Sequence, residues 1–286
     1  MTDEEVYHAH QLPVVVGSTV HLIQDPSDPM VAEFVKLKNP GSHMSPDGSH
    51  FMVEGPEAIR LLLSSGFVTE KILVKPSLLE SLRPNLESAD GSKALLLCDA
   101  TLMERITGIP ARHASAALAL ARRNARWQLK DLVPSEGPLR MLAMKDLDEE
   151  SVGALFRVAA AFGVDVVLLD STCGDPFHRR AVRVSMGHVL RLPFVQGNLK
   201  ELLSQLVQED VEAIALCQEQ GCFLDELSSM YHRWVCLIDG EINSPSPELL
   251  ALCRHRLAIQ KMAASVPLGV PVASSILLNG CAERDG

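Results

Sequence analysis

Short apolar runs of strand length alternate with amphipathic segments of helix length along most of the chain. Strands are predicted at FMVEG, KILVK and ALLLC, and further on at LRMLAMKD, VDVVLLD, VEAIALC and WVCLIDG. Helical spacing is found between them, as in PEAIRLLLSSG, where Pro56 stands in the first turn and Gly66 follows the end. Strands that alternate with helices predict an α/β protein whose C-terminal part has a parallel sheet covered on both faces.

Breaks in this alternation predict how the chain divides. Residues 1–22 form an N-terminal arm or an edge strand, and residues 23–130 form a small α/β domain. The segment 131–140, DLVPSEGPLR, contains two prolines and a glycine and is the predicted linker. Residues 141–286 then form a second α/β domain.

Composition agrees with two folded domains. The chain has 286 residues, of which 47% are hydrophobic, and this is enough to bury two cores. No stretch approaches the roughly 20 apolar residues of a membrane-spanning helix, so no membrane association is expected. The N-terminal sequence MTDEEVYHAH is acidic, whereas signal and transit peptides are basic, and we therefore expect no targeting segment.

The seven cysteines contain no CxxC pair, and several lie inside apolar runs. This pattern predicts small core residues in a reducing intracellular compartment, either the cytoplasm or an organelle matrix. Tyr7-His8-Ala9-His10 and the isolated His21 do not supply the tetrahedral ligand set of a zinc site. We therefore predict no bound metal.

The formal net charge of −10 has the wrong sign for a protein that coats nucleic acid nonspecifically. Positive charge is nevertheless concentrated in two groups, which either contact RNA locally or form solvated helix faces. The first group is Arg112, Arg122, Arg123, Arg126 and Lys130, and the second is Arg179, Arg180, Arg183 and Arg191.

Residues 148–194, DEESVGALFRVAAAFGVDVVLLDSTCGDPFHRRAVRVSMGHVLRLPF, closely resemble the opening of the catalytic domain of the SpoU/TrmH family of RNA 2′-O-ribose methyltransferases. In that family a segment of the form N-x-G-A-x-x-R opens the domain. The segments FMVEG and ITGIPARH also resemble the family's N-terminal substrate-recognition domain, a small α/β RNA-binding domain. Together the resemblance covers most of residues 22–280.

The resemblance implies a SPOUT fold, in which the C-terminal part of the chain threads through a loop and forms a trefoil knot. The knot would hold the cofactor S-adenosylmethionine (AdoMet), and two chains would pair through it as a homodimer. The implied partner is RNA, either rRNA or tRNA. The RNA-binding candidates are Arg112, His113, Arg122, Arg123, Arg179, Arg180 and Arg183.

The first family motif implies a catalytic arginine, and Arg157 stands at its position. In the family this arginine helps the ribose 2′-hydroxyl to lose its proton and binds the nearby phosphate, which suits a guanidinium. Ser151 stands where the family has asparagine.

The second family motif has the form G-x-E-G-x-G-L after a strand, and Gly240 and Glu241 match it. The three glycine positions of the motif hold Asp239, Ile242 and Ser244, and their side chains are expected to project where cofactor atoms should lie. Glu241 is therefore the second catalytic candidate.

The third family motif combines I-P with S-L-N-V-S, and this chain departs from it at the polar positions. Pro267 and Gly269 stand where the family has Ser and Asn, and neither can hydrogen-bond through a side chain. The cofactor-binding candidates from the last two motifs are Leu237, Gly240, Glu241, Ile259 and Leu268.

Apolar motif positions are kept while polar ones are lost, which favours a family member with impaired catalysis, a pseudoenzyme that acts as an RNA-binding or ribosome-assembly factor. Such a chain would work as a homodimer or paired with an active homologue. The alternative is an active AdoMet-dependent RNA 2′-O-methyltransferase. A third reading, an unrelated α/β enzyme, has no G-x-S-x-G, G-x-G-x-x-G or Walker A turn to support it.

Overall fold

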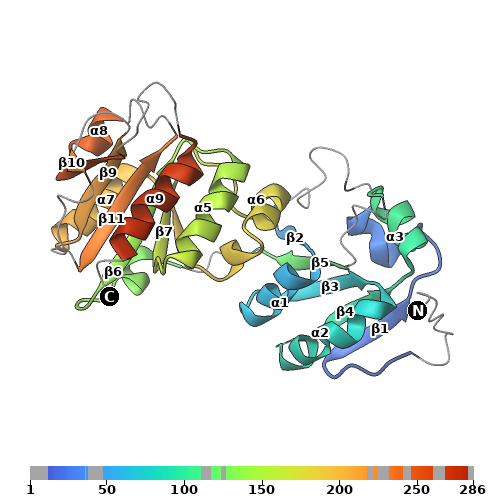
Figure 1. The fold of residues 1–286 in the computed structure, drawn as a ribbon. Coiled ribbons are helices and arrows are strands. Elements are labelled where there is room, and N and C mark those ends of the chain that lie inside the picture. Colours follow the sequence, from blue (N-terminus) through green and yellow to red (C-terminus); the bar gives the residue numbers. More distant parts are fainter. Residues whose placement is uncertain are drawn as a thin grey trace. The chain divides into compact units, whose positions relative to one another are not determined.

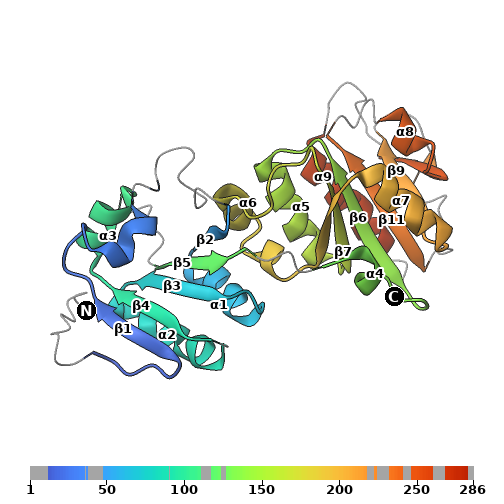
Figure 2. The same ribbon diagram turned by 180° about the vertical axis from the view of Figure 1, so that it is seen from behind.

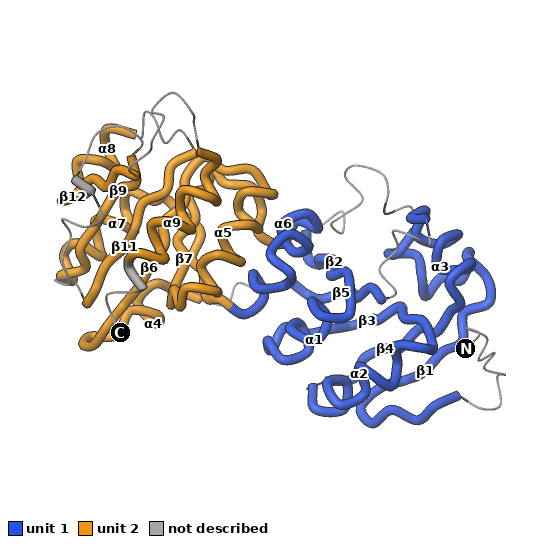
Figure 3. Tube along the Cα trace, in the orientation of Figure 1, with its two compact units in different colours: residues 1–125, 177–191 blue, residues 126–176, 192–286 orange. Residues whose placement is uncertain are grey.

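The computed structural model describes most of the chain as two compact units. The described residues are 12–35, 37, 48–89, 91–110, 117–123, 127–217, 222–223, 232–240, 246–259 and 268–282. Unit 1 consists of residues 1–125 and 177–191, and unit 2 of residues 126–176 and 192–286 (Figure 3).

The sheet of unit 1 is mixed, with its strands in the order β1-β4-β3-β5-β2. β1, β4 and β3 are parallel, whereas β5 is antiparallel to both β3 and β2. The strands are β1 (Ser18–Leu22), β2 (His50–Glu54), β3 (Thr69–Val74), β4 (Lys93–Leu97) and β5 (Ala117–Arg122). Within residues 1–22, the described β1 is thus an edge strand, one of the two forms expected there.

Helical segments cover this sheet. They are η1 (Pro29–Phe34), α1 (Pro56–Ser64), α2 (Pro76–Ser88) and α3 (Ala100–Thr107). One hydrophobic cluster joins Phe34 of η1 and Met103 of α3 to Leu73 and Leu96 of the sheet. α1 packs against α2 and against β2 and β5. Asp99 caps α3 by accepting a hydrogen bond from the Leu102 amide at 2.7 Å, which fixes where that helix begins.

A segment from much later in the chain, residues 177–191, completes unit 1. It contains α6 (Arg179–Val184) and η2 (His188–Leu190), which pack on β2 and α1 respectively. The Phe177 ring lies 4.7 Å from the Phe51 ring, centroid to centroid. At Gly187, with φ of +84°, an added Cβ would lie 2.9 Å from Ala58 Cα, so only glycine fits this contact.

The sheet of unit 2 is parallel throughout its described strands, in the order β10-β12-β9-β11-β6-β7-β8. These strands are β6 (Leu139–Lys145), β7 (Val166–Asp170), β8 (Phe194–Gly197), β9 (Glu212–Cys217), β10 (Cys222–Phe223), β11 (Arg233–Asp239) and β12 (His255–Ala258). The central strands are apolar on both faces, as buried parallel strands are.

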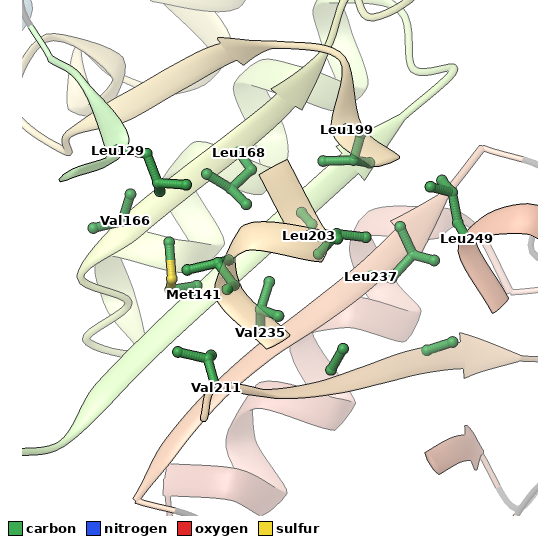
Figure 4. Close-up of a cluster of buried hydrophobic side chains, with 14 of the residues drawn as sticks. Leu129, Met141, Val166, Leu168, Leu199, Leu203, Val211, Val235, Leu237 and Leu249 are labelled. Atoms are coloured by element: carbon green, nitrogen blue, oxygen red, sulfur yellow. The ribbon is translucent and has the colours of Figure 1, made fainter. Parts of the chain in front are cut away.

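Helices cover both faces of this sheet. α5 (Glu149–Ala161) and α9 (Val270–Ala282) lie side by side on one face (Figures 1 and 2). α4 (Leu129–Leu132), α7 (Leu199–Gln208) and α8 (Pro247–Leu250) pack on the other. Figure 4 shows the hydrophobic cluster on that second face, where Leu203 of α7 and Leu249 of α8 meet Met141, Leu168 and Val235 of the strands.

The predicted α/β fold and the parallel C-terminal sheet are confirmed. The pattern did not predict β8, α7 or β12, although Leu199, Leu203 and Leu206 of α7 recur at helical spacing. Residues 177–191 were expected in the second domain but pack on unit 1, because Phe177 and Gly187 fit its core and α1. The knot remains a prediction from the family resemblance.

Candidate active site at the carboxyl edge of the unit 2 sheet

Three neighbouring strands of unit 2 end in charged residues. β6 ends at Lys145, β7 at Asp170 and β11 at Asp239. Because these strands are parallel, their carboxyl ends meet at one edge, and Asp239 pairs with Lys145 in the sheet register. Open α/β sheets bind ligands at this edge. The candidate active site is therefore built from the turns and helices that leave it.

The turn after β7 is held by a short hydrogen-bond chain. The Asp170 carboxylate accepts from the Thr172 amide at 3.0 Å and from its hydroxyl at 2.8 Å. The same carboxylate accepts the Leu199 amide at the start of α7 at 3.0 Å. The Thr172 hydroxyl oxygen in turn accepts the Asp146 amide at 3.2 Å. The turns after β6 and β7 are thus tied to each other and to α7.

Charge at this edge is balanced around Lys145. Its ammonium group pairs with the Asp146 carboxylate. That hydrogen bond raises the pKa of Lys145 against the lowering effect of burial, and the charges of Asp239, Asp146 and Asp170 add to the rise. The pKa of Asp146 is lowered by its hydrogen bonds with Lys145 and Thr172, which outweigh burial. Lys145 is therefore a fixed cation near neutral pH and not a base.

Gly240 lies against the turn after β6. Its amide donates to the Lys145 carbonyl at 2.9 Å. A Cβ at this position would lie 2.1 Å from the Asp146 carbonyl oxygen, so any other residue would displace the backbone. Asp146 itself has φ of +51°, an uncommon conformation for a residue with a side chain. Close packing therefore requires glycine at 240, a position at which the sequence matches the family.

Asp239 does not have the orientation expected from the sequence. Its side chain was expected to project toward the cofactor, but the residue is only 2% exposed. Its carboxylate accepts a hydrogen bond from the Ser246 amide at 3.1 Å. A carboxylate can be buried only where hydrogen-bond donors are available, and the Ser246 amide is such a donor. The Asp239 side chain therefore points into the protein. Glu241, Ile242 and Ser244 lie outside the described residues.

Arg157 and Ser151 are both on α5. Asp148 begins this helix by accepting the Ser151 amide at 2.8 Å, and Glu149 and Glu150 favour its N-terminus electrostatically. The cap sets the helix so that Phe156 is buried and Arg157 is exposed. Among the described residues, Arg157 forms no hydrogen bond or ion pair. Its guanidinium is therefore presented to solvent, as a substrate contact requires.

The cofactor candidates occupy different environments. Leu237 is 1% exposed within the hydrophobic core, so its side chain belongs to the core and is not available to a ligand. Ile259 and Leu268 are half-buried at the two ends of the connection from β12 to α9. At Gly269, exposed just before α9, an added Cβ would meet no atom of the described residues within 4 Å. Pro267 lies outside the described residues.

The RNA-binding candidates of unit 1 divide by burial. Arg179 is half-buried, pairs with the largely buried Glu54 carboxylate and donates to the Leu37 carbonyl. Burial lowers the pKa of Arg179 to about 10, so it stays charged at neutral pH. Arg180 and Arg183 of α6 are exposed.

The other candidates of unit 1 also differ in environment. The exposed Arg122 pairs with Glu70, whose carboxylate also accepts a hydrogen bond from His50 Nε2 at 3.0 Å. The Arg123 guanidinium lies over the Phe177 ring, 5.1 Å from its centroid. Arg112 and His113 lie outside the described residues, and so does Arg126, which belongs to unit 2.

Sequence reasoning missed Asp146, Asp170 and Thr172. The signal was present, because the predicted strands LRMLAMKD, VDVVLLD and WVCLIDG all end in aspartate or a residue beside it. Parallel strands bring such ends together, so the strand ends predict a polar edge. The positions of the strands alone do not show which of their ends are neighbours in the sheet.

Other sequence expectations concern cysteines, metals and membranes. Cys98, Cys173, Cys217 and Cys236 are buried, and burial raises the pKa of Cys98 to about 12. Within the described part of the chain, no group of three or more His, Cys, Asp or Glu side chains is placed to hold a metal ion. No helix among the described residues is long and apolar enough to span a membrane.

Comparison with known proteins gives a consistent family. Residues 142–279 match the family model described as the SpoU rRNA Methylase family. An uncharacterized tRNA/rRNA methyltransferase of Mycobacterium bovis is 28% identical over 229 residues, which cover 78% of this chain and 78% of that protein. The 23S rRNA (guanosine(2553)-2′-O)-methyltransferase RlmP of Bacillus subtilis is 24% identical over 80% of this chain and 86% of its own.

Solved structures share the fold at low sequence identity. The AdoMet-bound rRNA methyltransferase from Sinorhizobium meliloti superposes with a TM-score of 0.74 at 17% identity, over 93% of this chain and 98% of that chain. The SpoU methyltransferase AviRb from Streptomyces viridochromogenes, in complex with AdoMet, has a TM-score of 0.72 at 15% identity, over 90% and 98% of the two chains. The likeness includes the N-terminal unit as well as the parallel sheet.

Proposed function

Because the chain belongs through residues 142–279 to the SpoU rRNA methylase family, a family of RNA 2′-O-methyltransferases, we propose that it is an RNA-binding member with impaired methyl transfer. In this proposal it acts through its RNA-binding surface, as a ribosome-assembly or RNA-processing factor.

The observation that carries the proposal is the change of three polar positions of the family motifs, two of which have lost a hydrogen-bonding side chain. Ser151, Pro267 and Gly269 stand where the family resemblance implies Asn, Ser and Asn. Transfer depends on aligning the nucleophile with the methyl donor, and positioning supplies up to roughly 7–11 kcal/mol of rate acceleration in favourable cases. Among the described residues, no atom lies within 4 Å of a Cβ added at Gly269, so none of them replaces the lost amide there.

The cofactor of this proposal is AdoMet, which supplies an activated methyl group when bound. The described edge fits such a group, because Ile259 and Leu268 present apolar surface and Gly269 leaves room beside the first turn of α9. Gly240 brings backbone to the same edge. These residues would hold the cofactor mainly through packing and backbone groups.

RNA would be bound at two places. The exposed Arg157 offers a guanidinium to phosphate, which it can bind through two parallel hydrogen bonds. The exposed Arg180 and Arg183 of α6 offer a second cationic contact on unit 1. Local contacts of this kind allow an acidic chain to bind RNA, because each neutralised phosphate releases counterions.

A second candidate function is active RNA ribose 2′-O-methylation. It is favoured by the orientation of Asp239, whose side chain is turned to Ser246 and leaves the cofactor edge unobstructed. The names of the relatives also describe methyltransferases. Arg157 and Glu241 would then act on the ribose hydroxyl and its phosphate, as the family resemblance implies.

The chain is further proposed to work as a dimer, with itself or with an active homologue. Support comes from α9, where Val272 is 53% and Ile276 is 45% exposed one helical turn apart. An apolar pair of this kind favours a covered surface. Light scattering of the purified chain, alone and with a homologue, measures the assembly.

The test of the proposed function follows RNA binding and methyl transfer in the same samples. Purified protein is incubated with total rRNA or tRNA and AdoMet carrying a labelled methyl group. The proposal expects saturable, salt-sensitive RNA binding without label above a no-protein control. Label incorporated at stoichiometric levels into the RNA would instead establish the second candidate.

A further inference from the structure

Asp239 replaces a glycine of the family motif, yet the structure gives its carboxylate a defined partner. The residue is the last of β11 and 2% exposed. One carboxylate oxygen accepts the Ser246 amide at 3.1 Å, and this bond spans seven residues of the chain. A buried carboxylate is stable only when hydrogen-bond donors or cations surround it. The hydrogen bond from the Ser246 amide therefore fixes where the Asp239 carboxylate lies.

The connection between β11 and α8 is fixed at both of its described ends. At the first end, Gly240 donates to the Lys145 carbonyl at 2.9 Å and lies in tight contact with the Asp146 carbonyl. At the other end, Ser246 donates to Asp239 and begins α8, where its carbonyl accepts the Leu249 and Leu250 amides at 3.1 and 3.0 Å. Residues 241–245, which include the candidate Glu241, are joined to these two anchors.

The turn that contacts Gly240 is itself anchored. Thr172 binds the Asp146 amide, and Asp170 binds Thr172 and the first amide of α7. The Lys145 ammonium lies among the carboxylates of Asp146, Asp170 and Asp239, whose charges favour its protonated form. Lys145 thereby compensates the charge that Asp239 brings into this edge.

We infer that Asp239 is a positioning residue whose carboxylate holds the Ser246 amide and so fixes the start of α8 against the end of β11. At a glycine position of the motif, Asp239 is then a structural anchor between β11 and α8 and not a side chain that fills the site. This inference deepens the proposed function, since its consequence for AdoMet rests on that function. The anchoring itself does not depend on the cofactor.

Five variants separate the anchoring role of Asp239 from obstruction of the cofactor site. Asp239→Gly restores the family residue and removes the acceptor, whereas Asp239→Asn keeps an acceptor oxygen. Ser246→Pro removes the donor amide, and the Ser246 φ of −49° is close to the value that proline imposes. Ser246→Ala keeps the amide and is the matched control. Asp165→Gly is a second control, because Asp165 accepts the Arg140 amide at 2.8 Å beside the amino end of β6.

The first measurement is amide hydrogen exchange without cofactor, over peptides that contain residue 246. Faster exchange in Asp239→Gly and wild-type exchange in Asp239→Asn and Asp165→Gly are expected, because the Ser246 amide loses its acceptor only in the first variant. Equal exchange in wild type and Asp239→Gly, with both folded by circular dichroism, would overturn the inference.

The second measurement is AdoMet affinity by calorimetry. The inference predicts that Asp239→Gly and Ser246→Pro weaken binding by roughly 10-fold to 100-fold, the loss typical of one hydrogen bond to a charged group, while Asp239→Asn and Ser246→Ala bind like wild type. Tighter binding by Asp239→Gly would show that Asp239 obstructs the site and would overturn the inference. If wild type binds no AdoMet, the cofactor part of the proposed function fails, and the exchange result alone decides the anchor.

Discussion

The principal arginine candidates lie on two helices and differ in burial and in hydrogen-bond partners. On α6 in unit 1, Arg179 is half-buried, pairs with the Glu54 carboxylate and donates to the Leu37 carbonyl. On α5 in unit 2, Arg157 is exposed and has no hydrogen-bond or ion-pair partner among the described residues. In the sequence, both are arginines of the segment 148–194 that resembles the family, and nothing there distinguishes them. Their surroundings indicate that the first holds a domain together and the second is available to a ligand.

This difference shows why a cluster of basic residues is a weak sign of a nucleic-acid surface. Of the three arginines on α6, Arg179 neutralises a buried carboxylate, while Arg180 and Arg183 are exposed. Burial, and not the sequence spacing, separates the structural cation from those able to meet phosphate. The comparison leads to four predictions that differ in size.

The largest effect is expected from Arg179→Met, which leaves Glu54 buried without its cation. Breaking one half of a buried pair typically costs about 3–5 kcal/mol of unfolding free energy. Both tryptophans, Trp127 and Trp234, belong to unit 2, so fluorescence reports that unit while circular dichroism reports both. Urea unfolding followed by circular dichroism should show a large loss of unfolding free energy in Arg179→Met. The double variant Glu54→Gln/Arg179→Met should recover part of it, and an unchanged midpoint in the single variant would refute the structural role.

Arg157→Ala should leave the unfolding free energy nearly unchanged and lower the RNA affinity. Because the side chain is exposed and makes no described contact, its removal should change unfolding free energy by less than about 0.5 kcal/mol. RNA affinity should fall by about 1.5–3 kcal/mol if the guanidinium binds phosphate. Filter binding and urea unfolding on the same preparation test this pair of expectations, and Arg157→Lys is the charge-preserving control. A destabilised protein with normal RNA affinity would reverse the assignment.

Replacing Arg180 and Arg183 together should weaken RNA binding and flatten its dependence on salt. Each lost phosphate contact lowers the slope of log affinity against log salt by about 0.7–0.9. Arg254→Ala is a matched control, because Arg254 is an exposed arginine that pairs with Glu212 at 3.6 Å in unit 2. A slope equal to that of wild type would remove α6 from the RNA-binding surface.

The smallest effect concerns acid stability through Glu70. Burial raises its pKa, but the hydrogen bond and charge of Arg122 and the charge of His50 outweigh this and leave the pKa below 4.5. A carboxyl with a lowered folded pKa contributes stability above its ordinary value, and the contribution is lost as pH falls through the folded value. Because Glu70 is partly exposed, the contribution is about 0.2–1 kcal/mol. Glu70→Gln should lose stability at pH 7 and converge with wild type below pH 4.5 in urea unfolding.

The fold was largely predictable from sequence because it depends on spacing. Apolar runs at strand length and helices that begin at Pro56 or Asp148 follow from local rules. The placement of residues 177–191 on unit 1 was not predictable, since it depends on shape, as in the contact of Gly187 with Ala58. The role of Asp239 was also inaccessible, because only the structure brings its carboxylate to the Ser246 amide.

The candidate site was predictable only in part. Family motifs predicted Arg157 and Gly240 as site residues, and these roles stay predictions; the structure shows an exposed guanidinium at 157 and a close backbone contact at 240. The motif position of Leu237 predicts a cofactor contact. Its side chain faces the hydrophobic core, because alternate residues of a strand point to opposite faces. The hydrogen-bond chain from Asp170 through Thr172 to Asp146 joins two turns that are distant in sequence.

The changes at Ser151, Pro267 and Gly269 are proposed to limit methyl transfer, and restoring the family residues tests this most directly. Wild type is compared with the triple variant Ser151→Asn/Pro267→Ser/Gly269→Asn, in which asparagine at 269 has open space. Single-turnover transfer of a labelled methyl group from AdoMet to rRNA is measured at matched RNA occupancy. The account predicts background transfer by wild type and a clear gain in the triple variant. Efficient transfer by wild type, with no gain on restoration, would contradict it.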